Sequence, residues 1–291
     1  MTPQDYDYLR KILKERSGLL LSEDKQYLVD SRLLPLSRRA GLSGIGELVQ
    51  KMKGGSENLI SDVVEAMTTN ETFFFRDKIP FDNFRDTVVP DLIKARGSRR
   101  SLRIWCAAAS TGQEPYSLAM ILKDMGTALA GWRVEIVATD LSQEVLEKSK
   151  SGIYSQFEVQ RGLPIQLLVK HFTQTGEMWQ LKPEIRAMVQ YRELNLLKDF
   201  SHLGKFDVIF CRNVLIYFDQ PTKIDIFNRM LKANESDGCL FLGAAETVVG
   251  LTDAYRPCPQ RRGVYLPNIT RASPSLAPSM VAAKPIASRV S

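Results

Sequence analysis

An acidic residue at the end of a predicted strand is the first sign of a ligand site in this chain. Residues 134–139 are mostly apolar, and Asp140 follows them directly. A carboxylate in this position can accept hydrogen bonds from both hydroxyls of a ribose. The other interpretation is that Asp140 only caps the predicted helix 142–150, although Ser142 could cap that helix itself. We expect Asp140 to bind a ribose.

The residues before Asp140 predict the fold that would hold it. Leu102 to Ala107 is a short apolar run with the length of a buried strand, and the residues from Ala107 to Gly112 are small. A helix is predicted to start at Glu114-Pro115, because proline is tolerated in the first helical turn. A strand, a turn of small residues and a helix form the first unit of a doubly wound α/β sheet. In such sheets a ligand lies over the carboxyl ends of the strands.

The turn lacks the glycines that a dinucleotide requires. A pyrophosphate is typically bound by the pattern GxGxxG, and this chain has only Gly112 in the equivalent place. The pattern therefore favours a ligand with a ribose and an adenine but no phosphate, which is S-adenosylmethionine. The carboxylate of its amino-acid end could pair with Arg76, and its ammonium with Glu114.

Residues 1–85 show helical patterns only and predict an N-terminal helical domain. Its second helix is predicted from Lys25 to Leu34, with Ser22 as the cap and Pro35 as an end or kink. Basic residues spaced seven apart predict a positive face, which is either a solvated surface or a site for an acidic partner. The residues of this face are Lys25, Arg32 and Arg39, joined by Arg38.

The stretch from Thr68 to Arg76 combines small polar residues with three phenylalanines and an arginine. We expect its phenylalanines to be buried and its polar side chains to close over a ligand. A helix from Phe81 to Ala95 and a polar connection should then lead into the sheet domain, so that residues 86–100 form a linker.

The sheet domain is predicted to span residues 101–267. Alternating residues around Pro183 predict a hairpin, and hence a small β-subdomain at about residues 175–194. The strand from Phe206 to Cys211 is expected beside the first strand, which places its end at the ligand crevice. Residues 268–291 are rich in Ala, Ser and Pro and are predicted to be disordered.

Composition narrows the functional classes. The chain has 291 residues, of which 44% are hydrophobic and 25% charged, as in ordinary soluble proteins. Its four cysteines lack CxxC spacing, which indicates buried reduced thiols in a cytoplasmic protein and no metal site. The pattern shows neither a signal peptide nor a membrane-spanning stretch. A net charge of +6 without a dense basic block does not favour a nucleic-acid partner.

Five motifs resemble those of the CheR-type chemotaxis receptor glutamate O-methyltransferases. They are TTNETFFFR at 68–76, WCAAASTGQEPYSLA at 105–119, ATD at 138–140, LNLL at 194–197 and FDVIFCRNVLIYF at 206–218. The resemblance spans about residues 1–266. It implies an all-α N-terminal domain, a Rossmann-like S-adenosylmethionine-dependent methyltransferase domain and an inserted small antiparallel β-subdomain. It also implies methyl transfer to glutamate side chains on the cytoplasmic helical bundle of a chemoreceptor (a methyl-accepting chemotaxis protein), and we expect the enzyme to be a monomer.

The resemblance also assigns roles to individual positions. It implies that Tyr217 lies near the transferred methyl, where Tyr217 and Arg76 would orient the acceptor carboxylate. Gln113 stands where many members of the family have a glutamate. The basic second helix would face the receptor through Arg32, Arg38 and Arg39, and a receptor C-terminal peptide could dock on the β-subdomain. The implied contacts to S-adenosylmethionine, or to its product S-adenosylhomocysteine, are Asn70, Thr72, Arg76, Glu114, Asp140, Asn195, Leu196, Arg212 and Asn213.

Methyl transfer to a glutamate needs no catalytic base, because a carboxyl with a pKa of about 4.3 is already ionised at neutral pH. One alternative is a methyltransferase for nucleic acids or small molecules. An amine on a base would call for an Asn/Asp-Pro-Pro-aromatic sequence after the fourth strand, where this chain has Arg212 to Leu215. The other alternative is a non-catalytic module that binds S-adenosylmethionine or docks to a receptor.

Overall fold

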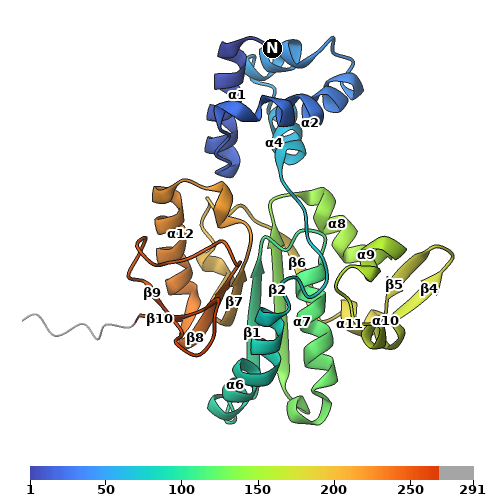
Figure 1. Cartoon of the computed structure of the whole chain (residues 1–291), viewed down its shortest axis with the longest axis vertical. Coiled ribbons are helices and arrows are strands. Elements are labelled where there is room, and N and C mark those ends of the chain that lie inside the picture. The colour runs from blue at the N-terminus through green and yellow to red at the C-terminus, as the bar shows by residue number, and fades with distance from the viewer. Residues whose placement is uncertain (269–291) are drawn as a thin grey trace, which may run out of the picture.

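The N-terminal part of the chain is a bundle of α-helices. The structure, a computed structural model, describes residues 1–268. Helices with buried side chains such as Leu9, Leu33 and Leu48 pack around one apolar core. In Figure 1 this helical domain lies at one end of the molecule, beyond the sheet. Its helices are α1 (Pro3–Ser17), α2 (Gln26–Arg39), α3 (Ile45–Lys53) and α4 (Glu57–Met67), with a 3₁₀ turn, Glu23–Lys25, before α2.

Helix α2 differs from its prediction at both ends. Ser22 does not cap it, since the Ser22 hydroxyl donates to the Asp24 carboxylate and a 3₁₀ turn comes first. Pro35 does not end it, and the helix continues to Arg39. A proline inside a helix costs about 3 kcal/mol. The burial of Leu33 and Leu36 on either side of Pro35 offsets that cost, because both side chains pack into the core of the bundle.

A seven-stranded sheet forms the larger domain. Its strand order is β6-β2-β1-β7-β8-β10-β9, with β10 antiparallel to both of its neighbours and the other pairs parallel. Ala107 pairs with both Thr139 and Cys211, so the carboxyl ends of the three central strands meet at one edge. The strands are β1 (Ser101–Ala107), β2 (Arg133–Asp140), β6 (Val189–Glu193), β7 (Phe206–Cys211), β8 (Asn234–Leu242), β9 (Tyr255–Pro257) and β10 (Val264–Pro267).

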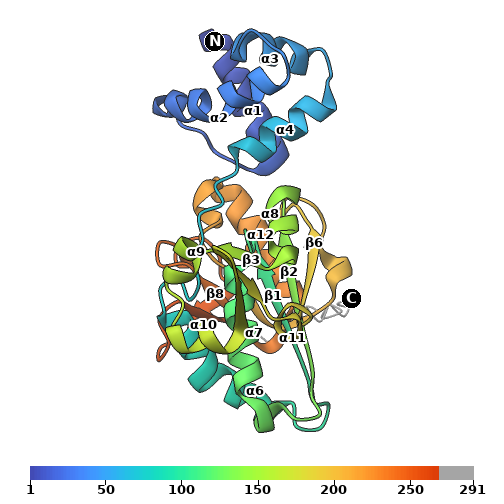
Figure 2. The ribbon, with the colours of Figure 1, turned by 90° about the vertical axis from the view of Figure 1, so that its right-hand side faces the viewer.

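Helices cover both faces of this sheet, as Figures 1 and 2 show. One face carries a core that includes Tyr116 and Phe210, and the other a core that includes Trp105 and Phe227. All four cysteines are buried and free, as predicted. The helices are α5 (Ile79–Asn83), a π-helical turn (Phe84–Val88), α6 (Val89–Ala95), α7 (Gln113–Asp124), α8 (Gln143–Ser151) and α12 (Gln220–Ala233), with 3₁₀ turns at Gly126–Leu129, Ser201–Leu203 and Leu215–Tyr217.

Residues 70–95 pack with the sheet rather than with the helical bundle. Phe74, Phe81 and Phe84 are fully buried in the core that also contains Phe210. The expected boundary at residue 85 therefore lies inside a segment that covers the sheet. Sequence periodicity could not show this, because it identifies a buried helix face but not the surface against which that face packs.

The inserted antiparallel sheet is present, but the predicted hairpin is wrong. Its strand order is β3-β5-β4, and the turn between β4 and β5 contains Gly176 with a φ of 62°. Pro183 does not mark a hairpin turn; it begins a short helix, where its missing N–H costs little. Residues 189–193 belong to the main sheet beside β2. The elements are β3 (Ile153–Ser155), α9 (Gln156–Gln160), α10 (Ile165–His171), β4 (Phe172–Thr175), β5 (Met178–Leu181) and α11 (Pro183–Arg186).

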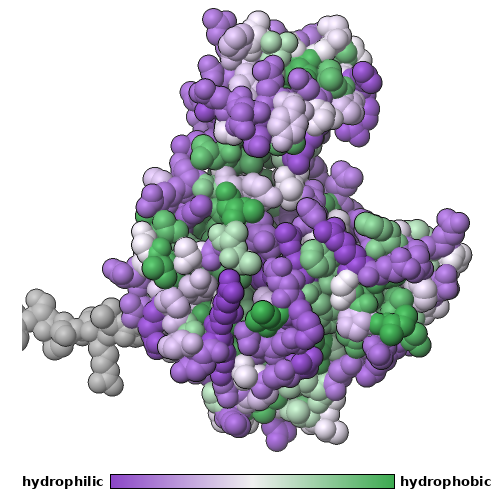
Figure 3. All heavy atoms as spheres, viewed as in Figure 1, coloured by the Kyte–Doolittle hydropathy of each residue, from purple (hydrophilic) through white to green (hydrophobic). Residues whose placement is uncertain are grey.

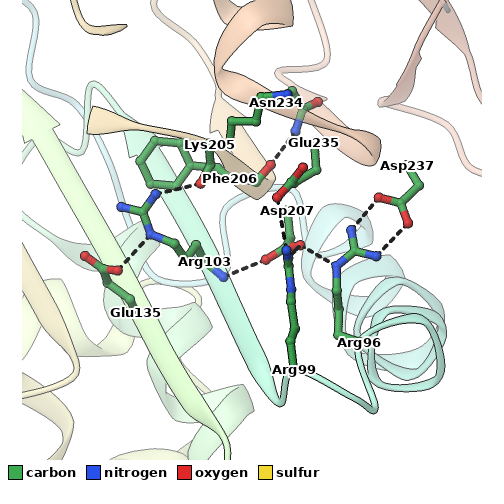
Figure 4. A network of polar contacts seen from close by, with 10 residues as sticks. All are labelled: Arg96, Arg99, Arg103, Glu135, Lys205, Phe206, Asp207, Asn234, Glu235 and Asp237. Atoms are coloured by element: carbon green, nitrogen blue, oxygen red, sulfur yellow. Dashed lines mark hydrogen bonds and ion pairs between the residues drawn. The ribbon is translucent and has the colours of Figure 1, made fainter. Parts of the chain in front are cut away.

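A charged network joins the amino-terminal ends of β1 and β7 (Figure 4). The Asp207 carboxylate, 1% exposed, accepts hydrogen bonds from Arg96 Nε at 2.8 Å, from the backbone N–H of Arg103 at 2.8 Å and from Arg99. Arg96 also pairs with Asp237. Because these bonds connect the helix before β1 to strands β7 and β8, they set how the helix lies on the edge of the sheet.

We expect Asp207→Asn to lower the free energy of unfolding by about 2 kcal/mol, because an amide leaves the buried Arg96 without its full countercharge. Urea denaturation followed by circular dichroism measures this change. Asp253→Asn, at an exposed position, is the control and should change stability by less than about 0.5 kcal/mol. Equal stability of the Asp207→Asn variant and the wild type would contradict a structural role for the network.

Candidate active site

A pocket lies over the carboxyl ends of the central strands, between the sheet and the helical domain. The end of α1, the segment after α4 and the loops that follow β1, β2, β6 and β7 all line it. The lining contains every residue predicted to bind the cofactor or to act in catalysis, namely Asn70, Thr72, Arg76, Glu114, Asp140, Asn195, Leu196, Arg212, Asn213 and Tyr217. The three arginines predicted to bind the receptor are not among these lining residues.

The loops after β1 and β7 adopt unusual backbone conformations. Ala108, Ser110 and Asn213 have φ angles of 63°, 50° and 59°, in the left-handed region that residues with a side chain rarely occupy. Such conformations cost about 1–3 kcal/mol each and concentrate at binding and catalytic sites. Here they turn the chain sharply at the end of each strand, which leaves room for a ligand above the sheet.

Asp140 lines the pocket, where its carboxylate could accept hydrogen bonds from a ribose. It is 8% exposed, and its two oxygens accept hydrogen bonds from the backbone N–H groups of Ser110 at 2.8 Å and Ser142 at 3.0 Å. A carboxylate has about four lone-pair sites, so these two bonds leave acceptor capacity for a ligand. Ser142 caps helix α8 itself, by accepting from the N–H of Val145. Burial raises the pKa of Asp140 above its ordinary value, against the lowering effect of the backbone donors.

Glu114 forms an ion pair that the sequence did not predict. Its carboxylate accepts from Arg212 at 2.9 Å, and Arg212 also donates to Asp77 at 2.7 Å. The Arg212 side chain is 1% exposed, and its Nε has no hydrogen-bond partner within the described residues. Burial raises the pKa of Glu114 above 4.5, although Arg212 opposes the shift. The pocket therefore contains a desolvated carboxylate that a ligand ammonium could approach.

Arg76 lies at the edge of the same pocket. Its guanidinium donates to the backbone carbonyl of Glu71 at 2.8 Å and lies over the ring of Phe73, with 5.6 Å from its central carbon to the ring centroid. Together, Arg76 and Glu114 offer a cation and an anion, which suits the zwitterionic end of S-adenosylmethionine. The residues of the pocket thus fit this cofactor at its ribose and at its amino-acid end.

Glu246 shapes the site, although the sequence analysis did not single it out. Its buried carboxylate accepts four backbone hydrogen bonds, from Asn213 at 2.8 Å, Val214 at 2.9 Å, Leu215 at 2.8 Å and Gly243 at 2.8 Å. These bonds hold the loop that leads to the Tyr217 turn. An acid just beyond the carboxyl end of β8 was the available signal, and it is the same kind of signal that identified Asp140.

The end of α1 also reaches the pocket, which the sequence did not predict. The backbone N–H of Leu20 donates to the carbonyl of Tyr217 at 2.8 Å, and Asn195 Nδ2 donates to the carbonyl of Arg16 at 2.6 Å. Gly18 ends α1 with a φ of 78°, and a Cβ there would lie 2.7 Å from the ring of Phe218. The helical domain therefore contacts two residues that line the pocket, Tyr217 and Asn195.

Comparison with known proteins agrees with this geometry. Residues 70–264 match the family model of the CheR methyltransferase SAM-binding domain, and residues 4–68 match that of the CheR methyltransferase all-alpha domain. The chain belongs to the CheR methyltransferase family. It is thus a methyltransferase that uses S-adenosylmethionine, with an all-α domain before a Rossmann-like domain. In this CheR protein the two matched ranges meet at residues 68–70, directly after α4.

Curated relatives extend this assignment over most of the chain. Chemotaxis protein methyltransferase 1 of Pseudomonas aeruginosa is 46% identical over 258 residues, which cover 87% of this chain and 93% of the relative. Chemotaxis protein methyltransferase Cher2 of Pseudomonas putida is 43% identical over 257 residues, with the same two coverages. The chemotaxis protein methyltransferase of Escherichia coli is 37% identical over 244 residues, 82% of each chain. Sequence similarity therefore includes both domains of this CheR protein.

Two further findings concern the described residues of the CheR chain. Between residues 1 and 268, no helix combines the length and the apolar composition that crossing a bilayer requires. Within the same residues, no group of three or more His, Cys, Asp and Glu side chains is arranged to hold a metal ion.

Proposed function

We propose that this CheR protein transfers the methyl group of S-adenosylmethionine to glutamate side chains on the cytoplasmic helical bundle of a chemoreceptor, forming glutamyl methyl esters in chemotaxis adaptation. The observation that carries the proposal is the pocket itself. It brings together the ribose-binding position Asp140, the ion pair of Glu114 and Arg212, and two residues suited to an acceptor carboxylate, Arg76 and Tyr217. The curated relatives are named chemotaxis protein methyltransferases, which supports a chemotaxis substrate.

When bound, the cofactor would supply an electrophilic methyl group on a sulfonium, and transfer of that methyl to a carboxylate oxygen would break the S–C bond and release a neutral thioether. The protein has to hold the acceptor in line with the S–C bond and to exclude water. Arg76 can orient the incoming carboxylate, and the Tyr217 hydroxyl can donate a second hydrogen bond to it. Asp140 and Glu114 hold the two ends of the cofactor.

The acidic receptor bundle would dock on helix α2. Arg38 and Arg39 are exposed near its carboxyl end, where their positive charges also interact favourably with the helix dipole. Arg32, the third arginine of this predicted face, is engaged within the chain, as described below. An acidic partner would approach Arg38 and Arg39 by electrostatic attraction, so its affinity should fall as salt concentration rises.

A receptor C-terminal peptide would bind at the small sheet. Strand β4 is at an edge of that sheet, so a peptide strand can add to it through backbone hydrogen bonds. Apolar side chains are exposed nearby, including Phe157, Ile165 and Val169, and Figure 3 shows hydrophobic atoms on this part of the surface.

We also propose that the enzyme acts in the cytoplasm as a monomer.

Methylation can be tested directly with S-adenosylmethionine labelled on its methyl group. The purified protein is incubated with the labelled cofactor and with membranes that contain the chemoreceptors of the organism that encodes it. The proteins are separated by gel electrophoresis, and the base-labile label in the receptor band is counted. Label that alkali releases as methanol indicates methyl esters. Binding of S-adenosylhomocysteine without any ester in the receptors would contradict the proposed substrate and favour a non-catalytic role.

A further inference from the structure

We propose that Arg32 is a positioning residue for cofactor binding, which acts by holding the segment between the two domains rather than by contacting the receptor. Its guanidinium donates to the backbone carbonyls of Met67 at 2.6 Å and Thr68 at 2.9 Å, and to the Thr69 hydroxyl at 3.1 Å. These three residues line the pocket. The inference rests on the proposed function only in that this pocket is the one that binds the cofactor.

The position of Arg32 follows from the electrostatics of helix α4. The last carbonyls of a helix lack intrahelical partners and carry partial negative charge, which a nearby cation stabilises. The last turn of α4 contains no basic residue. Arg32 supplies that cation from α2, and its planar guanidinium binds two carbonyls with one nitrogen and the neighbouring hydroxyl with another.

A continuous set of hydrogen bonds leads from this point to Asp140. Asn70 Nδ2 donates to Thr68 Oγ1 at 3.1 Å, and the Asn70 carbonyl accepts from Ser110 Oγ at 2.7 Å. The backbone N–H of Ser110 then donates to Asp140 at 2.8 Å. The segment that Arg32 holds is thus connected, through Asn70, to the loop that orients the ribose-binding carboxylate.

The end of α4 is attached to the sheet domain as well. Glu65 Oε1 accepts from the Ser142 hydroxyl at 2.7 Å and from the backbone N–H of Glu144 at 2.8 Å, at the start of α8. Arg32 therefore holds the end of α4 within the helical domain, and Glu65 holds it to the sheet domain. Removing Arg32 would remove the side-chain hydrogen bonds that tie Met67, Thr68 and Thr69 to α2.

Isothermal titration of the receptor-free, full-length protein with S-adenosylhomocysteine tests the inference. We expect Arg32→Ala to raise the Kd about tenfold and Arg32→Lys to raise it about threefold, because lysine restores the charge but not the planar fork. Lys51→Ala, which removes an exposed cation of helix α3 that makes no ion pair among the described residues, should leave the Kd within twofold of the wild-type value. Arg32→Gln replaces Arg32→Ala in the test if the alanine variant does not fold.

A purely structural role for Arg32 gives a different result. It would lower the melting temperature and leave the Kd of the folded protein unchanged, and a Kd within twofold of wild type for the neutral Arg32 variant would overturn the inference. Thr68→Val removes the bond from Asn70 and should also raise the Kd. In the double variant with Arg32→Ala, the change in binding free energy should be smaller than the sum of the two single changes. No binding to the wild type would count against the proposed function, whereas equal binding to wild type and variant counts only against the role of Arg32.

Discussion

Asp140→Ala is expected to weaken the binding of S-adenosylhomocysteine about a hundredfold. A buried carboxylate that accepts from both ribose hydroxyls makes two charge-assisted hydrogen bonds, and each contributes about 1.5–3 kcal/mol. A loss of about 2.8 kcal/mol corresponds to a hundredfold change in Kd. The substitution also leaves the N–H groups of Ser110 and Ser142 without their acceptor, so the loops on both sides of the ribose lose their support.

Two variants make the Asp140 experiment specific. Asp140→Asn keeps one acceptor oxygen and should bind with intermediate affinity. Asp253→Ala, at an exposed position in the same domain, should bind like the wild type. Calorimetry at a temperature well below the melting transition of every variant measures the affinities of folded protein only. Normal binding by Asp140→Ala would show that the ribose lies elsewhere.

Glu246→Ala is expected to lower kcat for receptor methylation about a hundredfold, with a smaller effect on cofactor affinity. The carboxylate holds the backbone of Asn213, Val214 and Leu215 against Gly243, and no other side chain in the described residues accepts from those N–H groups. Without it the loop must rearrange, because a buried unsatisfied N–H costs about 1–3 kcal/mol. A displacement of about 1 Å at Tyr217, the last residue of this loop, can reduce the rate by about two orders of magnitude.

The distribution of the effect between kcat and Kd separates positioning from general destabilisation. Tyr217 is proposed to contact the acceptor, so Glu246→Ala should change the rate of transfer more than the Kd for S-adenosylhomocysteine. Single-turnover methylation measures the rate, and calorimetry the Kd. Glu184→Ala removes an exposed carboxylate from the small subdomain and serves as the control. A variant with a lower melting temperature but the wild-type transfer rate would contradict the positioning role.

Several residues that line the pocket could be grouped from sequence because they follow strands. Asp140 and Arg212 come directly after buried apolar runs, and parallel strands bring their carboxyl ends to one edge of a sheet. The pocket lining accordingly contains every predicted cofactor and catalytic position. The small sheet was harder to predict, because short alternating runs do not identify their partners. Residues 189–193 alternate like a hairpin strand but pair with β2 in the main sheet.

The amino-acid sequence by itself determined the family, the order of the two domains and the cofactor, and it predicted positions that line one pocket. Local patterns carry this information, since strand ends, small-residue turns and helix starts are short-range features. Only the tertiary structure decided how these side chains are paired. Glu114 with Arg212, Glu246 with the loop after β7, and Arg32 with the end of α4 each join residues about 30 to 100 positions apart. Hydrogen bonds at such separations depend on how the elements pack, and no spacing along the chain specifies them.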